Sequence, residues 1–157
     1  MSRIYSICYQ PAPSQDKPPY RYNRVPIAKA ELIAAHGIKG DRKAGRNPNR
    51  QLNLMSYETL AALSKDGYKV QPGEMGEQII IEGLDVMSLQ KGDRLMIGEN
   101  ACIEITKPRT PCDWFEKIQG KSPEEAAGRV GMLAKVIVSG QICVGDSVKV
   151  VEKVAVR

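Results

Sequence analysis

One cysteine of this chain has the surroundings that reactive thiols need. Cys112 closes the segment Pro108-Arg109-Thr110-Pro111-Cys112, and its two prolines fix φ and extend the residues before them, which predicts a stiff arm. Residues 113–118 can start a helix, and a thiol at a helix N-terminus near Lys107 and Arg109 gains thiolate character. Such a thiol suits a soft metal or a transferable sulfur atom. The alternative is a buried core cysteine after a proline turn.

A basic segment from His36 to Arg50 is the second candidate for chemistry. It holds five lysines and arginines and three glycines. Glycines let a ligand approach the backbone, and lysine and arginine side chains bind phosphate. The segment lacks the Gly-Lys-Ser/Thr ending of a P-loop. A solvated basic loop is the alternative, and nucleic-acid binding is a weaker one because no aromatic residues are interleaved for base stacking.

Two glycine-bearing stretches could also face a ligand. Pro72-Gly73-Glu74-Met75-Gly76-Glu77 places two carboxylates in a turn-forming segment ahead of an apolar strand. Gly128-Arg129-Val130-Gly131 places an arginine between glycines just before another strand, where it suits a phosphate or carboxylate. On their own, both stretches are better explained as structural turns.

Composition narrows the class of protein. The 157 residues favour one domain, over 1–157, and the single Trp and single Phe leave the core to aliphatic side chains. One histidine excludes a multi-histidine metal site, and four cysteines without a C-x-x-C pair argue against a zinc knuckle or a dithiol redox motif. The net charge of +5 favours an anionic partner. No apolar run is long enough to cross a membrane and no signal-peptide core is present, so we expect a reducing cytoplasm.

The elements that must position these residues are mostly strands. Period-two patterns and turn residues predict strands over Arg3–Tyr9, Val25–Ala34, Gln51–Met55, Gln78–Ile81, Asp93–Ile97, Ala101–Thr106, Leu133–Val138 and Ser147–Val151. A helix is predicted over Tyr57–Lys65, capped by Ser56 and ended by Gly67. Ser122-Pro123 opens a short second helix. Many short strands with few short helices predict a mainly-β fold, as a closed or nearly closed β-barrel.

The ordered motifs of this chain resemble one family. Taken along the chain, the motifs are Gly37-Ile38-Lys39-Gly40-Asp41-Arg42, Arg50-Gln51-Leu52-Asn53-Leu54, Pro72-Gly73-Glu74-Met75-Gly76-Glu77, Gly92-Asp93-Arg94, Pro108-Arg109-Thr110-Pro111-Cys112, Gly128-Arg129-Val130-Gly131 and Gly145-Asp146. This series resembles the molybdenum-cofactor sulfurase C-terminal (MOSC) domain in stand-alone form. The resemblance runs from about Ile4 to Val151.

The resemblance implies a MOSC-type β-barrel and a site for the pterin-bound molybdenum cofactor, of the molybdopterin type. Cys112 would be the molybdenum ligand or the carrier of a persulfide sulfur. Candidates for the cofactor's phosphate and metal oxo groups are Lys39, Arg42, Arg50, Arg109 and Arg129. Some relatives are fused to a pyridoxal-phosphate sulfurase, and this chain is too short for that domain, so pyridoxal phosphate would come only through a partner sulfurase.

Two function classes stay open at this point. The first is an enzyme that reduces a small-molecule substrate at a cysteine-ligated molybdenum, as family members do with N-hydroxylated compounds, and it would need a reductase partner. The second is a non-catalytic carrier that passes sulfur or cofactor between partners through Cys112, in metal-sulfur or molybdenum cofactor biosynthesis. A basic barrel that binds nucleic acid is the weaker third reading.

Overall fold

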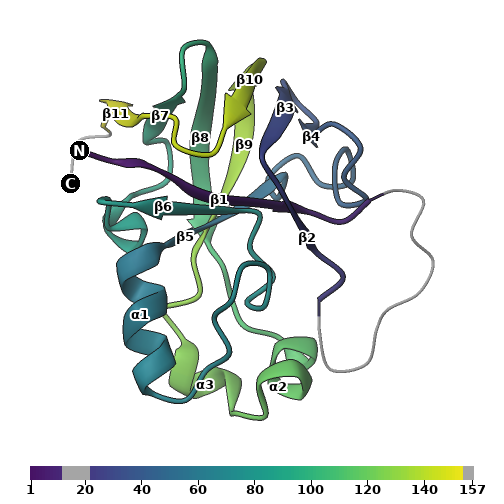
Figure 1. Cartoon of the computed structure of the whole chain (residues 1–157), viewed down its shortest axis with the longest axis vertical. Coiled ribbons are helices and arrows are strands. Elements are labelled where there is room, and N and C mark those ends of the chain that lie inside the picture. The colour runs from purple at the N-terminus through teal and green to yellow at the C-terminus, as the bar shows by residue number, and fades with distance from the viewer. Residues whose placement is uncertain (12–21, 154–157) are drawn as a thin grey trace.

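The computed structural model of the chain describes residues 1–11 and 22–153. In this part of the chain, strands dominate, and three α-helices gather at one end of the molecule (Figure 1). The mainly-β class predicted from the sequence is confirmed. The strands are β1 (Arg3–Tyr9), β2 (Val25–Ile27), β3 (Lys29–Ile33), β4 (Gly37–Ile38), β5 (Leu52–Ser56), β6 (Ile79–Glu82), β7 (Arg94–Ile97), β8 (Ala101–Pro108), β9 (Met132–Val138), β10 (Gly140–Cys143) and β11 (Val148–Glu152).

The larger sheet has the strand order β11-β7-β8-β9-β5-β6-β1-β2. Its central strand β5 pairs with β9 in the antiparallel sense and with β6 in the parallel sense. All five β5 residues are buried, so both faces of this central strand are covered. β5 then passes directly into the first helix, so the sheet and the helical end share one rigid connection.

The large sheet approaches a barrel but is not closed into one by continuous strand pairing. Its two sides meet through one isolated bridge between Arg3 and Ser147. The amide of Ile4 donates to the Asp146 carbonyl at 2.9 Å, and the Ile4 carbonyl accepts from Gly145 at 2.8 Å. Of the predicted closed or nearly closed barrel, the fully closed form is not found, because β1 meets the Gly-Asp turn before β11 rather than the strand itself.

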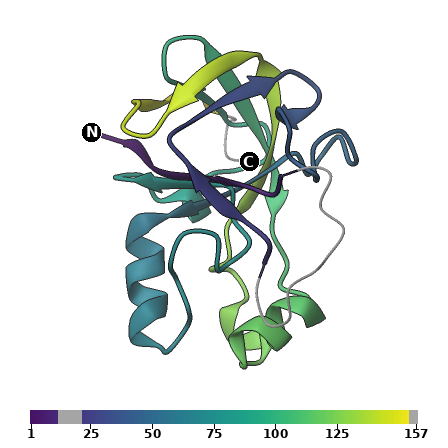
Figure 2. The same cartoon turned by 45° about the vertical axis from the view of Figure 1, so that its right-hand side comes forward.

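A second, smaller sheet has the order β10-β3-β4 and lies at the end opposite the helices (Figures 1 and 2). The single strand predicted over Val25–Ala34 is wrong, because the chain changes sheets at Ala28. β2 pairs with β1, whereas β3 pairs with β10, and the Ala28 carbonyl accepts from the Val144 amide at 2.9 Å. β4 and β10 were not predicted, since both begin with a glycine and are too short to show a period.

The helices are α1 (Tyr57–Lys65), α2 (Asp113–Gln119) and α3 (Pro123–Ala126), with a 3-10 turn η1 (Val86–Ser88). Ser56 is the N-cap residue of α1, as predicted, but its side chain makes no capping hydrogen bond. Its hydroxyl instead donates to the Leu84 carbonyl at 2.6 Å and accepts from the Val86 amide at 2.7 Å. Ser122 does cap α3, because its hydroxyl accepts from the Glu124 amide at 3.3 Å.

Aliphatic side chains fill the main core between the strands, as the scarcity of aromatic residues predicts. A second apolar cluster joins the sheet to the helical end, and it contains Leu60 and Leu63 of α1 together with Tyr68 and the sole phenylalanine, Phe115 of α2. This second cluster fixes α2, and therefore the helix start at Cys112, against the sheet. Within the described residues, none of the helices has the length and apolar character needed to cross a membrane.

Candidate functional site

Cys112 lies where the sequence predicts it, at the start of a helix. β8 ends at Pro108, and the Arg109 amide then donates to the Gly131 carbonyl at 2.9 Å, which anchors the arm beside the start of β9. Cys112 is the N-cap residue of α2 and has extended backbone angles, φ −121° and ψ 178°. It is exposed, whereas Cys8 and Cys102 are buried. The alternative of a buried core cysteine is therefore excluded.

Arg109, three residues before this cysteine, points into the protein and is only 7% exposed. Its guanidinium donates to the Met75 carbonyl and, at 2.9 Å, to the hydroxyl of Tyr22. The same group lies over the Tyr22 ring, at 5.7 Å from the centroid, and near the Phe115 ring, at 5.8 Å. These contacts connect the cysteine arm, the Gly73–Gly76 turn and the segment before β2.

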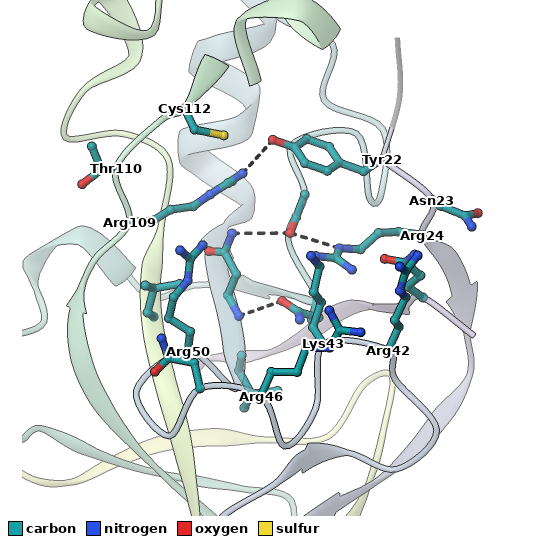
Figure 3. Close-up of a pocket in the computed structure, with 17 residues that line it drawn as sticks. Tyr22, Asn23, Arg24, Arg42, Lys43, Arg46, Arg50, Arg109, Thr110 and Cys112 are labelled. Carbon is teal, nitrogen blue, oxygen red and sulfur yellow. Dashed lines mark hydrogen bonds between the residues drawn. The ribbon is translucent and has the colours of Figure 1, made fainter. Parts of the chain in front are cut away.

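A cavity of about 550 Å³ opens beside this arm. Its described lining carries six cationic side chains and no carboxylate; the cations are Arg24, Arg42, Lys43, Arg46, Arg50 and Arg109. Four of them come from the loop between β4 and β5, and Cys112 and Thr110 line the facing side (Figure 3). The basic loop and the cysteine arm, about 65 positions apart in the chain, thus face one cavity.

Arg24, a half-buried residue of the cavity lining, lies near two buried carboxyl groups. Arg24 donates to the Gly76 carbonyl at 3.1 Å. Burial lowers the pKa of Arg24, while the nearby carboxylates of Asp41 and Glu77 act in the opposite direction. Asp41 is itself fixed, because it accepts from the Gln10 amide at 2.9 Å and from the Gln78 side chain at 3.4 Å. Two buried carboxyl groups that are not among the residues lining the cavity therefore lie close to the Arg24 charge.

Glu77 holds the turn of the Pro72–Glu77 stretch from inside. Its carboxylate accepts from the amides of Gly73, at 2.7 Å, and Met75, at 3.1 Å. Burial is the main reason that the pKa of Glu77 is raised, and these hydrogen bonds oppose it. The role of Glu77 agrees with the interpretation of this stretch as a structural turn. Gly76, in contrast, is one of the residues that line the cavity.

Tyr22 is the aromatic side chain of the cavity that the sequence did not single out. Its hydroxyl accepts a hydrogen bond from Arg109 and lies on the same side of the cavity as the Cys112 sulfur (Figure 3). Burial raises the pKa of Tyr22, a nearby Cys112 thiolate raises it further, and the Arg109 charge opposes both. The phenol therefore stays protonated at neutral pH and presents a neutral polar group beside Cys112.

The structure brings together four of the six site residues expected from the sequence. Cys112, Arg109, Arg42 and Arg50 all line the cavity. The other two expected residues, Lys39 and Arg129, are not among its lining residues. Lys39 forms an exposed ion pair with Glu31 at 3.5 Å.

Arg129 is engaged at another place on the surface. It pairs with Asp66 at 2.7 Å, donates to the Glu125 carbonyl at 3.0 Å, and lies 5.8 Å from the centre of the Tyr68 ring. These contacts connect the segment before β9 to the end of α1. Arg129 thus joins two elements of the helical end rather than facing the cavity.

Sequence reasoning missed other lining residues for two different reasons. Arg46 and Lys43 belong to the basic segment that was recognised, but the family resemblance did not single them out. Tyr22 and Arg24 follow a proline-rich stretch with no motif of their own. Only the pairing of β2 with β1 brings that segment to the cavity, so no local signal could have found them.

The arrangement is thus an exposed thiol at a helix start, facing a row of arginines in a mainly-β fold. The chain matches the MOSC domain family over residues 41–149. This match covers more than half of the sequence, and the chain belongs to the MOSC domain family. The resemblance inferred from the ordered motifs is confirmed.

Individual relatives agree with this family. A curated protein named "Reductase", from Gibberella moniliformis, is 26% identical over 135 residues, which cover 78% of this chain and 24% of that protein. This chain therefore spans about a quarter of that relative's length. Among solved structures, the YuaD protein from Bacillus subtilis matches with a TM-score of 0.74 and 20% identity over 94% of each chain. YiiM from Escherichia coli gives 0.72 and 22% over 98% of this chain and 71% of its own. At these identities the structures show the fold.

Proposed function

We propose that this protein binds a molybdenum cofactor of the molybdopterin type in the arginine-lined cavity and reduces a small N-hydroxylated substrate there. Cys112 would be the protein ligand to molybdenum. The observation that carries this proposal is the exposed Cys112 thiol beside a cavity whose described lining is cationic and free of carboxylates. MOSC membership and the name of the fungal relative support the reductase class.

The residues present fit such a cofactor. A thiolate is a soft donor of the kind that molybdenum accepts, and Cys112 is exposed at the cavity. The cofactor ends in a phosphate, and guanidinium groups bind phosphate through charge-assisted, bidentate hydrogen bonds. Arg42 and Arg50 are the cavity arginines that fit this role. A cavity of about 550 Å³ has the size of an ordinary small-molecule site.

Within this proposal, the cofactor supplies two-electron redox chemistry when bound. The overall change in the substrate is R–NH–OH + 2 e⁻ + 2 H⁺ → R–NH₂ + H₂O, in which the N–O bond breaks and the electrons come from a reductase partner or a reduced dye. The protein's own residues bind and orient the reactants. Arg109 holds the arm that carries Cys112, while the loop arginines attract the anionic groups.

The experiment that tests the proposal measures molybdenum and phosphorylated pterin in protein produced in a host that makes the cofactor. Wild type should hold molybdenum close to one per chain and reduce an N-hydroxylated compound with reduced viologen as electron donor. Cys112→Ser keeps the size and hydrogen-bonding capacity but loses the soft sulfur. The variant should retain pterin through the arginines and lose most of its turnover. Wild type without molybdenum and without turnover would refute the reductase function.

A sulfur carrier is the second candidate function, because Cys112 is exposed and a partner protein can reach it. In that case the Cys112 thiolate would attack the outer sulfur of a donor persulfide R–S–SH, form Cys112–S–SH and release the thiolate R–S⁻, which takes up a proton from water. Incubation with a sulfurase system should then add one sulfur atom to the intact mass of wild type and none to Cys112→Ser. Sulfur loading without bound molybdenum would favour the carrier over the enzyme.

A further inference from the structure

Few residues of the cavity lining can give a proton to a bound molecule. Breaking the N–O bond of an N-hydroxylated compound needs a proton on the oxygen that departs, because hydroxide is a strong base and leaves poorly. The described lining contains no carboxyl group and no histidine. Its arginines are excluded as donors, because a guanidinium group does not release its proton in proteins. The remaining candidates are Tyr22, Lys43, Thr110 and Cys112.

Position and acidity select Tyr22 among these candidates. Lys43 lies across the cavity from Cys112, and the Thr110 side chain points away from the cysteine (Figure 3). An aliphatic hydroxyl is also a much weaker acid than a phenol. Cys112 is the metal ligand of the proposed function, so its sulfur is already engaged as a thiolate. The Tyr22 hydroxyl and the Cys112 sulfur point toward one another in Figure 3, so a substrate beside the sulfur meets the phenol.

The hydrogen bonds of the Tyr22 hydroxyl suit a proton donor. Its oxygen accepts from the Arg109 guanidinium at 2.9 Å, and no described residue accepts the proton of the hydroxyl. The proton can therefore be given to a ligand in the cavity. After it leaves, the phenolate faces a cation at hydrogen-bond distance, and a hydrogen bond between two ionised groups is stronger than one to the neutral phenol. Arg109 thus stabilises the conjugate base.

The ring of Tyr22 is held by contacts that do not involve its hydroxyl. Its centre lies 5.7 Å from the Arg109 guanidinium carbon, in a cation–π contact. The ring carbon that bears the hydroxyl also lies so close to Gly76 that a Cβ atom on this glycine would be only 2.9 Å away. Both contacts remain in Tyr22→Phe. This variant therefore removes the hydroxyl and keeps the ring.

We propose that Tyr22 is the proton donor of the reduction, and that its hydroxyl protonates the departing oxygen of the N–OH group while Arg109 stabilises the phenolate. This assignment rests on the proposed reductase function. The O–H bond of Tyr22 breaks, its proton joins the departing oxygen, and the oxygen leaves as water. The two electrons that break the N–O bond come from the reductase partner or the reduced dye. One solvent proton then goes to the nitrogen and another restores the phenol, so two protons are consumed overall.

The test measures a single turnover, because the N–O bond then breaks without waiting for the delivery of electrons. Reduced holoprotein in excess is mixed with N-hydroxybenzamidine, and formation of the amidine is followed in time. Tyr22→Phe should slow this step about a hundredfold or more, as is typical for the loss of a general acid. Tyr57→Phe removes the hydroxyl of an exposed tyrosine of α1 outside the cavity lining and should keep the wild-type rate.

Two readouts that do not depend on turnover separate proton donation from support of the Cys112 arm. The molybdenum content of the holoprotein should be the same in Tyr22→Phe and in wild type. The rate at which iodoacetamide modifies Cys112 in cofactor-free protein should also stay close to that of wild type. Loss of molybdenum, or an altered thiol, in Tyr22→Phe would show that Tyr22 acts through Arg109 as a positioning residue, and would overturn the assignment.

A rescue experiment tests the proton itself. Tyr22→Ala removes the ring and leaves space for a small aromatic molecule. Added phenol should restore part of the single-turnover rate of this variant, because it supplies an acidic O–H group. Anisole has a similar shape and no O–H group, so it should restore nothing. Equal rescue by both compounds would show that the ring only fills space, and would overturn the assignment.

The outcomes separate the role of Tyr22 from the function itself. A Tyr22→Phe rate equal to that of wild type would leave the reductase function standing and refute Tyr22 as the proton donor. Wild type without molybdenum and without turnover would refute the proposed function, and the proton donor with it.

Discussion

Neighbouring residues of the Pro108–Cys112 arm have different roles because they face different environments. Cys112 is exposed at the start of α2, whereas Arg109 is buried and donates to a carbonyl and a phenol. The family resemblance implied an anion contact for both Arg109 and Arg129. The structure places the Arg109 guanidinium among protein groups and Arg129 in an ion pair with Asp66. The reactivity of Cys112 and the contribution of Arg109 to stability can therefore be tested separately.

Cys112 should be the first cysteine to react with a limiting amount of iodoacetamide at neutral pH in cofactor-free protein. It is exposed at a helix N-terminus, whereas burial raises the pKa of Cys8 and Cys102 and keeps them as thiols. Peptide mapping by mass spectrometry identifies the modified residue. Earlier modification of the half-buried Cys143 would show that the helix start does not activate Cys112.

Arg109→Met should destabilise the fold by about 2–4 kcal/mol, because it removes two charge-assisted hydrogen bonds and leaves the Met75 carbonyl unpaired. Arg129→Met is the matched control. It removes a partly exposed ion pair with Asp66 and should cost about 1 kcal/mol or less. Urea denaturation gives both values. Similar losses for the two variants would contradict a special supporting role for Arg109.

Among the elements, the Gly73–Gly76 turn is the one that Arg109 contacts directly. Glu77 holds the turn by accepting from two of its amides, and Arg109 and Arg24 bind its carbonyls from the other side. The two Gly-Asp turns, Gly92-Asp93 and Gly145-Asp146, are also held by a carboxylate that accepts from a nearby backbone amide. Asp93 accepts from the Gln90 amide at 2.9 Å and Asp146 from the Cys143 amide at 2.8 Å, and the strands that follow, β7 and β11, pair with each other.

Gly76→Ala should be more harmful than Gly128→Ala, although both glycines have nearly the same backbone angle, φ 82° and 81°. Each alanine suffers the left-handed penalty of about 1–2 kcal/mol. Only at Gly76 would the new methyl lie 2.9 Å from the Arg109 guanidinium and from the Tyr22 ring, whereas nothing lies within 4 Å at Gly128.

The extra cost at Gly76 should be about 1–3 kcal/mol, the range for an overpacked site. Thermal and urea unfolding measure it for both variants. We also expect altered iodoacetamide reactivity of Cys112 in Gly76→Ala alone, because Arg109 must move. Equal stability of the two variants would show that the backbone of the turn accommodates the methyl group without displacing Arg109.

At the scale of the whole molecule, charges of opposite sign lie on opposite sides of the cavity wall. The cavity lining is cationic, while Asp41 and Glu77 are buried behind it, close to Arg24. A buried carboxyl with a raised pKa makes unfolding depend on pH, since the folded state holds its proton more tightly than the unfolded chain does. Glu77 gives the chain such a dependence.

Stability from Glu77 should be fully present below its ordinary pKa of 4.5 and decrease as the pH rises through the raised value in the folded protein. Glu77→Gln removes this titration. The unfolding free energy of wild type minus that of Glu77→Gln should therefore fall as the pH rises above 4.5, and subtraction cancels the other carboxyls. Urea denaturation from pH 4 to about 8 measures the difference. A difference that increases with pH would contradict the raised pKa.

The sequence by itself determined the local elements and the reactive residue. β1 and α1 have the predicted bounds, because alternation and helical period are local signals. The proline arm and the helix start after it placed Cys112 at the N-cap of α2 without tertiary information. The ordered motifs identified the family through resemblance, because residue types and their order along the chain are read directly from the sequence.

Only the tertiary structure decided which charged side chains meet. The approach of β2 to β1 brings Tyr22 and Arg24 to the cavity, and no local pattern encodes it. Arg109 and Arg129 are both arginines beside turns, yet one is buried against Met75 and the other is drawn to Asp66. A buried charged side chain needs a partner, because burial without one is costly. That partner often comes from a segment that is distant in the sequence. The destination of such a side chain is therefore a property of the assembled fold.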